Sequence, residues 1–404
     1  MQILSYKYRL YPNKAQKEFL AQHFGCVRKI YNYFLSESGS DYQNYDQPWN
    51  RYRYQRQLPA LKQQFAYLSD VNSQSLQVSL QNLDKAFKAF FKKRADYPQF
   101  KSKHYEQSFC IPQSTTVDFE AKTIFIPKLK TGIRCELHRA FEGQIKSSTI
   151  TKNCQGQYYI SITVERDIEQ EIVSTLDAAK AIGIDVGLES FLTMSDGTKV
   201  DNPRWLKKAE RKLKKLQRWL SKKIKGSSNR NKQRTKVAKQ HAKVANQRKD
   251  FQHKLSRKLV DDNQVSMIFA EDLNIRGMLK NSRLAKSISS VAWGQFLRFL
   301  EYKAHRKGKL FQKIGKFKAS SKLCHVCGYK HDNLELSDRI WKCPKCDTVH
   351  DRDINAAINI RNIGLNTVGT TGIYACGEET STIEPLILWQ VTSPKQEAPQ
   401  FIEG

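Results

Sequence analysis

Four cysteines near the carboxyl end stand in two CxxC pairs, and their spacing is that of a metal site. Cys324 pairs with Cys327 and Cys343 with Cys346, with 15 residues between the pairs. Each CxxC knuckle presents two thiolates to one ion, and the intervening chain returns as a hairpin, which gives tetrahedral Cys₄ zinc. Redox CxxC motifs occur singly, so two at this spacing favour zinc. A Cys₄ site has no open position, so we expect one structural Zn²⁺ that contributes folding energy and no chemistry.

Three acidic residues are candidates for a second centre. Asp185 follows an apolar run, Glu271 ends another, and Asp353 opens a helical stretch after the cysteines. Acids at the ends of elements can converge although they are far apart in sequence, and converging carboxylates repel one another unless cations separate them. With two Mg²⁺ ions, or Mn²⁺ in their place, they could hydrolyse a phosphodiester by in-line displacement, one metal activating water and the other stabilising the leaving oxygen. A single acid at a strand end is more often a cap or turn residue, and Asp272 and Asp351 are alternatives to their neighbours.

The charge of the chain indicates what such a centre would act on. The 404 residues include 69 Lys and Arg against 39 Asp and Glu, a net charge of +30. A surface this positive repels itself unless it meets a polyanion, so we expect a nucleic-acid partner. Residues 204–258 hold 22 of the basic side chains and only two acids. Their apolar positions recur at helical spacing on both sides of residues 226–231, which predicts a helical hairpin whose basic face contacts phosphates.

The same sequence gives no sign of a membrane or a secretory route. No apolar run is long enough to span a bilayer, and the start MQILSYKYRLYP lacks a charged segment followed by an apolar one. Nine cysteines, four of them in one cluster, are typical of a reducing compartment rather than of a disulfide framework. We therefore expect a cytoplasmic protein.

Other elements must position the candidate centres. Residues 3–11 alternate as a strand, and residues 105–166 contain short β-type runs between turns, so both could belong to one antiparallel sheet. Residues 14–94 follow helical periodicity and would be inserted into that sheet. A new domain begins at Lys180. From about Leu365 the chain turns polar and rich in Gly, Thr and Pro, and we expect a disordered tail.

Aromatic residues of the helical insertion have two interpretations. Tyr52 lies between Arg51 and Arg53 in a segment rich in Tyr and Gln. Most aromatic side chains of such a segment are expected in the core. A minority that is exposed beside arginine would suit base stacking.

Several stretches together resemble the OrfB, or TnpB, family of insertion sequences, which are transposon-encoded RNA-guided nucleases related to type V CRISPR effectors. The matching stretches include YKYRLYPNKAQKEFL, GIDVGLESFLTMSDG, EDLNIRGM, SSKLCHVCG and WKCPKCDTVHDRDINAAINI. They run from the first strand to the tail, so the resemblance covers nearly the whole chain.

This resemblance implies an α/β multidomain fold. A β-barrel wedge domain would contain an inserted helical recognition domain, and an RNase H-like (RuvC) nuclease domain would contain an inserted zinc ribbon that binds target nucleic acid. The expected ranges are 1–12 and 105–167 for the wedge, 13–104 for the recognition domain, 180–317 and 347–364 for the nuclease domain with its basic hairpin 204–258, 318–346 for the ribbon and 365–404 for the disordered tail.

The resemblance also implies an activity. The family's catalytic acids match Asp185 in GIDVG, Glu271 in AEDL and Asp353 as the second acid of DRD, and its zinc ligands match the four cysteines. A Mg²⁺-dependent RNA-guided DNA endonuclease follows: a guide RNA from the transposon end would pair with a double-stranded DNA target beside a short flanking motif. We expect a monomeric ribonucleoprotein, prokaryotic, nucleoid-associated in use and without a membrane.

Two other functions are open. A transposase could join DNA strands with the same fold and metals. A regulator could bind nucleic acid without catalysis, but binding alone gains nothing from carboxylates clustered among phosphates.

Overall fold

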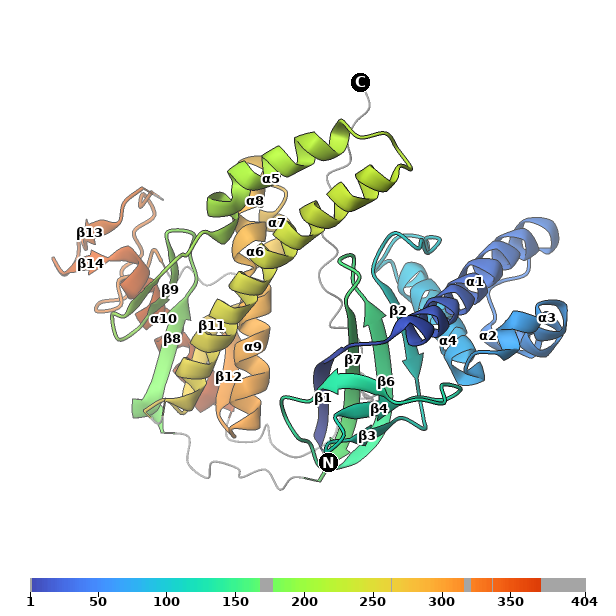
Figure 1. The fold of residues 1–404 in the computed structure, drawn as a ribbon. Coiled ribbons are helices and arrows are strands. Elements are labelled where there is room, and N and C mark those ends of the chain that lie inside the picture. The colour runs from blue at the N-terminus through green and yellow to red at the C-terminus, as the bar shows by residue number, and fades with distance from the viewer. Residues whose placement is uncertain (1, 168–176, 263, 316–320, 336, 372–404) are drawn as a thin grey trace. The chain divides into compact units, whose positions relative to one another are not determined.

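The computed structural model describes most of the chain, in two compact units (Figure 1). The described residues are 2–167, 177–262, 264–315, 321–335 and 337–371. Unit 1 comprises Met1–Ile172 and Arg204–Phe251, and unit 2 comprises Val173–Pro203 and Gln252–Gly404. The expected α/β fold in more than one unit is confirmed. Among the described residues, every helix is too short or too polar to cross a bilayer.

Unit 1 is built on a curled antiparallel sheet in the order β2-β6-β7-β1-β5-β4-β3. The strands are β1 (Gln2–Leu10), β2 (Gln107–Ile111), β3 (Thr116–Asp118), β4 (Thr123–Phe125), β5 (Ile133–Glu136), β6 (Gln144–Lys152) and β7 (Tyr158–Arg166). The first strand lies inside this sheet, because β1 pairs with β7 from Gln2↔Arg166 to Leu10↔Tyr158. The prediction that the chain start shares a sheet with the later strands is confirmed. In the described pairing β2 and β3 end the sheet, so closure into a barrel stays a prediction.

Helices fill the interval between β1 and β2, where the sequence shows helical periodicity. They are α1 (Lys14–Tyr45), α2 (Arg51–Arg56), α3 (Leu58–Gln64), the 3₁₀ helix Ala66–Ser69 and α4 (Ser73–Phe91). A capping box starts α1: the Gln16 amide donates to Asn13 Oδ1 at 2.9 Å and the Asn13 amide donates to Gln16 Oε1 at 3.0 Å. Gln16 Nε2 also donates to the Gly132 carbonyl, which ties the helix start to the sheet.

The basic stretch folds as the predicted helical hairpin, α5 (Trp205–Ser221) and α6 (Ser228–Asp261). Leu213 is buried in the hairpin, and Gln233 Nε2 donates to the Leu216 carbonyl at 3.0 Å. Arg230 donates to the carbonyls of Leu220 and Lys223, at and just beyond the end of α5.

Unit 2 has a five-stranded sheet in the order β10-β9-β8-β11-β12. The strands are β8 (Ala181–Asp185), β9 (Ser190–Met194), β10 (Lys199–Asp201), β11 (Met267–Glu271) and β12 (Leu310–Ile314). The first three form an antiparallel meander, whereas β8, β11 and β12 are parallel. Parallel neighbours need long crossovers. The one between β11 and β12 contains α7 (Ile275–Met278), α8 (Ser282–Val291) and α9 (Trp293–Arg306).

Two boundaries differ from the prediction. Helix α10 (Arg352–Thr371) continues past the expected start of a disordered tail at residue 365, because Leu365 and Val368 extend its apolar face onto the cluster around Phe269. The prediction is therefore wrong for residues 365–371, and residues 372–404 lie outside the described residues. The strands β13 (Ile340–Lys342) and β14 (Val349–Asp351) pair, so the hairpin that contains Cys343 and Cys346 extends beyond residue 346, the expected end of the ribbon.

Candidate active site and metal centre

Two of the candidate acids end neighbouring parallel strands. Asp185 is the last residue of β8 and Glu271 the last of β11. The register pairs Ile184 with Ala270, one position before each acid. Parallel strands end at the same edge of a sheet and lie about 4.8 Å apart, so both carboxylates leave the same edge. We call this edge of unit 2 the carboxyl edge.

Helix α10 brings the third acid to the carboxyl edge. At Gly183 a Cβ atom would lie 2.0 Å from the Ala357 carbonyl oxygen and 2.6 Å from the Arg361 nitrogen, so the helix rests directly on the strand backbone. From this contact Asp185 is two residues along the strand, about 6.6 Å. Asp353 is four residues back along the helix, about 6 Å. The two displacements match, and they bring Asp353 over Asp185.

The electrostatics of Asp185 agree with three acids near one another. The pKa of Asp185 is raised from 3.8 to about 7, first by burial and then by the charges of Asp353 and Glu271. The pKa of Glu271 is also raised by burial. A buried carboxylate among others is costly to ionise, and a divalent cation removes this cost. The donor set therefore fits Mg²⁺, a hard cation that prefers carboxylate oxygen.

The alternative acid Asp351 has a different role. Its Oδ1 accepts hydrogen bonds from the amides of Asp353 and Ile354, both at 3.1 Å, so it caps the first turn of α10. Its Oδ2 lies 2.7 Å from Lys199 Nζ. Burial raises the pKa of Asp351, but the hydrogen bond from Lys199 and those from the helix outweigh it, and the pKa is lowered. Asp272 follows β11, and its amide donates to the Ile314 carbonyl; as the next residue along the strand, it is expected to face away from Glu271.

An arginine of the ribbon also reaches this centre. Arg339 Nη1 lies 3.3 Å from Asp353 Oδ1, and its Nη2 lies 2.9 Å from Glu189 Oε2. The Arg352 amide donates to the Arg339 carbonyl, which fixes the backbone at the same place. Sequence analysis missed Arg339 and Glu189, because neither belongs to a motif of characteristic spacing.

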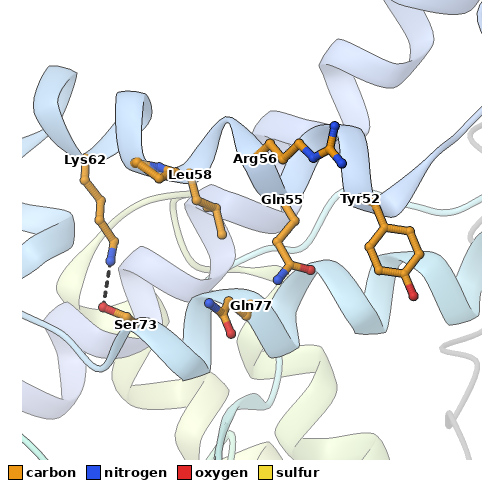
Figure 2. A pocket seen from close by; sticks show the side chains of 8 residues that line it. Tyr52, Gln55, Arg56, Leu58, Lys62, Ser73 and Gln77 are labelled. Carbon is orange, nitrogen blue, oxygen red and sulfur yellow. Dashed lines mark hydrogen bonds between the residues drawn. The ribbon is translucent and has the colours of Figure 1, made fainter.

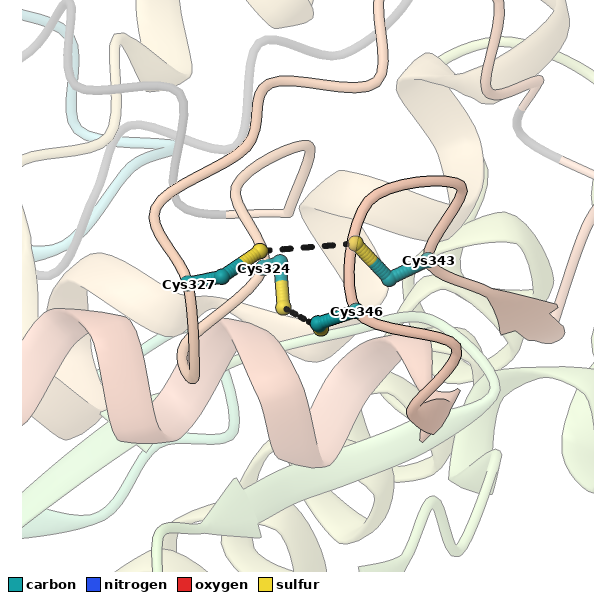
Figure 3. A group of neighbouring side chains, drawn as sticks. All are labelled: Cys324, Cys327, Cys343 and Cys346. Atoms are coloured by element: carbon teal, nitrogen blue, oxygen red, sulfur yellow. Dashed lines mark hydrogen bonds between the residues drawn. The ribbon is translucent and has the colours of Figure 1, made fainter.

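The four cysteines form the second centre (Figure 3), and their sulfur atoms all lie within 4.8 Å of one another. Cys324 Sγ is 3.6 Å from Cys346 Sγ, and Cys327 Sγ is 3.6 Å from Cys343 Sγ. Tetrahedral zinc with Zn–S bonds of about 2.3 Å requires sulfur atoms about 3.8 Å apart, so the cluster fits Zn²⁺. Among the described residues it is the one group of three or more such side chains close enough together to hold a metal ion, and the three acids do not form a group of this kind.

Both knuckles owe their shape to a residue with left-handed backbone. Gly328 (φ 71°) follows the first CxxC and Asp347 (φ 57°) follows the second. The Gly328 amide donates to the Cys324 carbonyl and the Asp347 amide to the Cys343 carbonyl. A positive φ turns the chain back at once, which brings the two thiols of each knuckle to one side.

A cavity of about 340 Å³ in unit 1 is a candidate contact site for polar ligands (Figure 2). Tyr52 and Gln55 of α2, Lys62 of α3 and Gln77 of α4 line it. Tyr52 is 65% exposed and lies under the Arg51 guanidinium, 4.5 Å from the ring centroid. Tyr54 of the same segment is buried, but Tyr42 and Tyr45 are exposed like Tyr52, so the expectation that most of these aromatic side chains lie in the core is wrong for the tyrosines of this segment. Tyr52, beside Arg51, has the surroundings that suit base stacking.

Three family models match the chain. A model described as "Probable transposase" (OrfB_IS605) matches residues 160–282, and a "Cas12f1-like, TNB domain" model matches residues 293–360. A third, described as a helix-turn-helix domain of the same OrfB family, matches residues 1–47. The structure has β1 and the single helix α1 in that region, so the described residues there contain no helix-turn-helix.

Two relatives match almost end to end. A "Putative RNA-guided DNA endonuclease" of Streptomyces pristinaespiralis is 36% identical over 381 residues, 93% of this chain and 91% of that protein. InsQ of Escherichia coli K12, which has the same description, is 30% identical over 421 residues, 99% of this chain and 98% of that protein. A solved Cas12f1–sgRNA–target DNA complex matches at 16% identity and a TM-score of 0.36, over 90% of this chain and 99% of that one; this likeness is too slight to carry an argument. The two relatives are decisive: the chain belongs to the OrfB, or TnpB, family of insertion-sequence proteins.

Proposed function

We propose that this protein is an RNA-guided DNA endonuclease of a transposable element, which cleaves target DNA by two-metal phosphodiester hydrolysis. The relatives of Streptomyces and Escherichia coli carry the first part of this description in their names. The observation that carries the proposal is the meeting of Asp185, Glu271 and Asp353 at one sheet edge, in a chain of net charge +30. A protein that only bound nucleic acid would weaken its own binding with such a group.

Each acid has a separate support in the fold. Asp185 and Glu271 are held by paired strands, and Asp353 is held by a helix that its neighbour Asp351 caps. Rigid elements keep carboxylates at fixed positions better than loops do. When bound, two Mg²⁺ ions would supply an activated water and stabilise the charge on the leaving oxygen. The protein's part is to hold the ions between the acids and to keep Arg339 beside Asp353, within reach of a substrate phosphate.

The other domain assignments belong to the same proposal. The sheet of unit 2 would be the RNase H-like (RuvC) nuclease domain, and the curled sheet and helices of unit 1 the wedge and recognition domains. One structural Zn²⁺ would occupy the four cysteines, supported by their 3.6 Å sulfur separations. The basic hairpin α5–α6 would contact phosphates of the guide RNA or target DNA. The particle would be a monomeric ribonucleoprotein.

A transposase is the second candidate, because a model described as "Probable transposase" matches residues 160–282. Strand joining and hydrolysis can use the same acids and metals, and they differ in the nucleophile. A hydrolase uses water, whereas a strand transferase uses a DNA 3′-hydroxyl. The products therefore distinguish the two: free ends in one case and joined strands in the other.

The test starts from the protein purified with its own RNA. Sequencing that RNA identifies the guide scaffold, and a plasmid that carries the matching target gives the substrate. Wild type should cut only with a matching guide and a divalent cation. Asp185→Ala should retain the RNA and lose cleavage, while Asp201→Ala, an exposed acid on β10 of the same sheet, should cut at the wild-type rate. Cleavage by Asp185→Ala at the normal rate would refute the active-site assignment, and joined products would favour the transposase.

A further inference from the structure

On both sides of Asp353 along the chain, side chains make polar contacts with the first knuckle, the segment around Cys324. Before Asp353, His350 is the middle residue of strand β14. After it, Asn355 and Asn359 lie one turn apart on α10. All three side chains are buried, with 3%, 1% and 7% of their surface exposed. Buried polar side chains with defined partners hold backbone segments in fixed positions.

The first link joins His350 to a zinc ligand. His350 Nε2 lies 3.1 Å from Cys324 Sγ. A zinc-bound thiolate has no proton and only accepts, so the imidazole must donate its Nε2 hydrogen to the sulfur. The ring is held by Trp341 on one side, at 4.7 Å between centroids, and His325 on another, at 4.8 Å.

The second link joins α10 to the backbone of the same knuckle. Asn355 Nδ2 and Asn359 Nδ2 both donate to the Leu323 carbonyl, each at 2.7 Å. Asn355 Oδ1 accepts from the His325 amide at 3.0 Å. These bonds hold the residues on both sides of Cys324, so the knuckle and the first two turns of α10 move as one piece.

We propose that the zinc knuckle is a clamp on the catalytic helix: a filled cysteine site fixes Asp353, with His350, Asn355 and Asn359 as the positioning residues. This inference rests on the proposed function for the role of Asp353. Binding energy of a structural zinc is folding energy of the segment that holds it, so the knuckle should loosen when the metal is removed. Without zinc, the Leu323 carbonyl that accepts from Asn355 and Asn359 is no longer held in position, and the first turn of α10 loses that support.

A simpler interpretation makes a different prediction. The three residues could merely attach the ribbon, with Asp353 fixed entirely by the contact of α10 at Gly183. Zinc would then have no effect at the carboxyl edge. Under the clamp, occupancy of the two metal centres is linked, and the linkage is reciprocal: zinc strengthens divalent-cation binding by the factor by which the cation strengthens zinc binding.

The experiment measures both centres in the full-length protein. Mn²⁺ binding at the acids is followed by electron paramagnetic resonance, after subtraction of the Mn²⁺ that Asp185→Ala protein binds. Zinc binding is followed by competition with a chromogenic chelator. Asn359→Ala removes one donor to Leu323, and Asn359→Asp keeps the size but replaces the donor by an acceptor. Asn362→Ala is the matched control, because Asn362 lies three positions further along the same helix and its Oδ1 accepts from Arg361.

The clamp predicts a joint loss. Asn359→Ala should weaken zinc binding by 10- to 100-fold, the effect of removing an outer-shell partner. The same variant should weaken Mn²⁺ binding at the acids several-fold, and Asn359→Asp should do so at least as strongly, while Asn362→Ala stays within twofold of wild type. In wild type stripped of zinc, Mn²⁺ binding at the acids should be as weak as in zinc-free Asn359→Ala protein. Unchanged Mn²⁺ affinity in zinc-stripped wild type would overturn the clamp.

A separate readout covers failure of the proposed function. If Asp185→Ala binds as much Mn²⁺ as wild type, the acids hold no cation and the proposed function fails first. The clamp is then tested by hydrogen exchange of the amides in residues 352–357, with and without zinc. Faster exchange on zinc removal supports the clamp, and equal exchange overturns it.

Discussion

Lowering the pH from 8 to 6 should weaken divalent-cation binding at the carboxyl edge by about tenfold. Only the ionised carboxylate binds the cation, and the pKa of Asp185 is raised from 3.8 to about 7, first by burial and then by the charges of Asp353 and Glu271. With a pKa of about 7, about 90% of Asp185 is ionised at pH 8 and about 10% at pH 6. A raised acid pKa therefore removes affinity as the pH falls through 7. The raised pKa of Glu271 acts in the same direction.

The assay is a titration with Mn²⁺ at pH 6, 7 and 8, with Asp185→Ala protein as the blank. Phosphodiesters stay ionised over this range, so cation bound by RNA cancels in the subtraction. The Mg²⁺ concentration that gives half-maximal cleavage should rise by the same factor, while the rate at saturating Mg²⁺ changes less. An affinity that is equal at pH 6 and pH 8 would show that Asp185 is already ionised in the empty centre. The inference that Asp353 and Glu271 lie close enough to Asp185 to raise its pKa would then be wrong.

Three further substitutions test the geometry. Gly183→Ala places a Cβ atom 2.0 Å from a carbonyl oxygen of α10, so it should abolish cleavage and destabilise the protein by about 1–3 kcal/mol or more in thermal melts, whereas Gly39→Ala, with open space around it, should do neither. Arg339→Gln removes the positive charge beside Asp353, which we expect to compete with the metal ion for this carboxylate. Because the ion pair is half exposed, Mn²⁺ affinity should rise by at most about fivefold, and a fall in Mn²⁺ affinity would contradict this competition. Asp185→Asn should raise the melting temperature of the metal-free protein, more at pH 8 than at pH 5. The folded protein holds the Asp185 proton more tightly than the unfolded chain, so wild-type stability falls as the pH rises from 3.8 to 7. At pH 8, a melting temperature of Asp185→Asn below that of the wild type would contradict this.

The cysteine cluster and the two acids at strand ends could be predicted from the sequence, because each leaves a local signature. Ligand spacing in the CxxC pairs is fixed by the knuckle itself, so it is visible without the fold. Asp185 and Glu271 each end a short apolar run, and parallel strands bring such ends to one edge. Whether the three acids catalyse is a matter for the cleavage experiment. Their meeting in space is what the structure adds.

Contacts made only by the tertiary fold left no such signature. Arg339 is one of 69 basic residues, and nothing in its neighbourhood marks it as the one that reaches Asp353. The buried Asn359 looks like an ordinary polar position of a helix until its partner Leu323 is known. The sequence does not predict where α10 ends, because the composition rich in Gly, Thr and Pro from about Leu365 indicates a disordered tail. In the fold, Gly364 is small because the ring of Phe269 lies where its side chain would be.

The topology of unit 2 explains why a zinc ribbon stands beside the acids at all. Strand β12 is parallel to β8 and β11, so it ends at the carboxyl edge. Helix α10 begins at that edge, with Asp353 in its first turn, and runs back toward the start of β8, where Leu365 and Val368 pack against the cluster that contains Ala181. The chain between β12 and α10 therefore leaves and re-enters the sheet at the same edge. A segment inserted there starts and ends beside the acids. Arg339 of this segment reaches Asp353, and its His325 amide donates to Asn355 of α10.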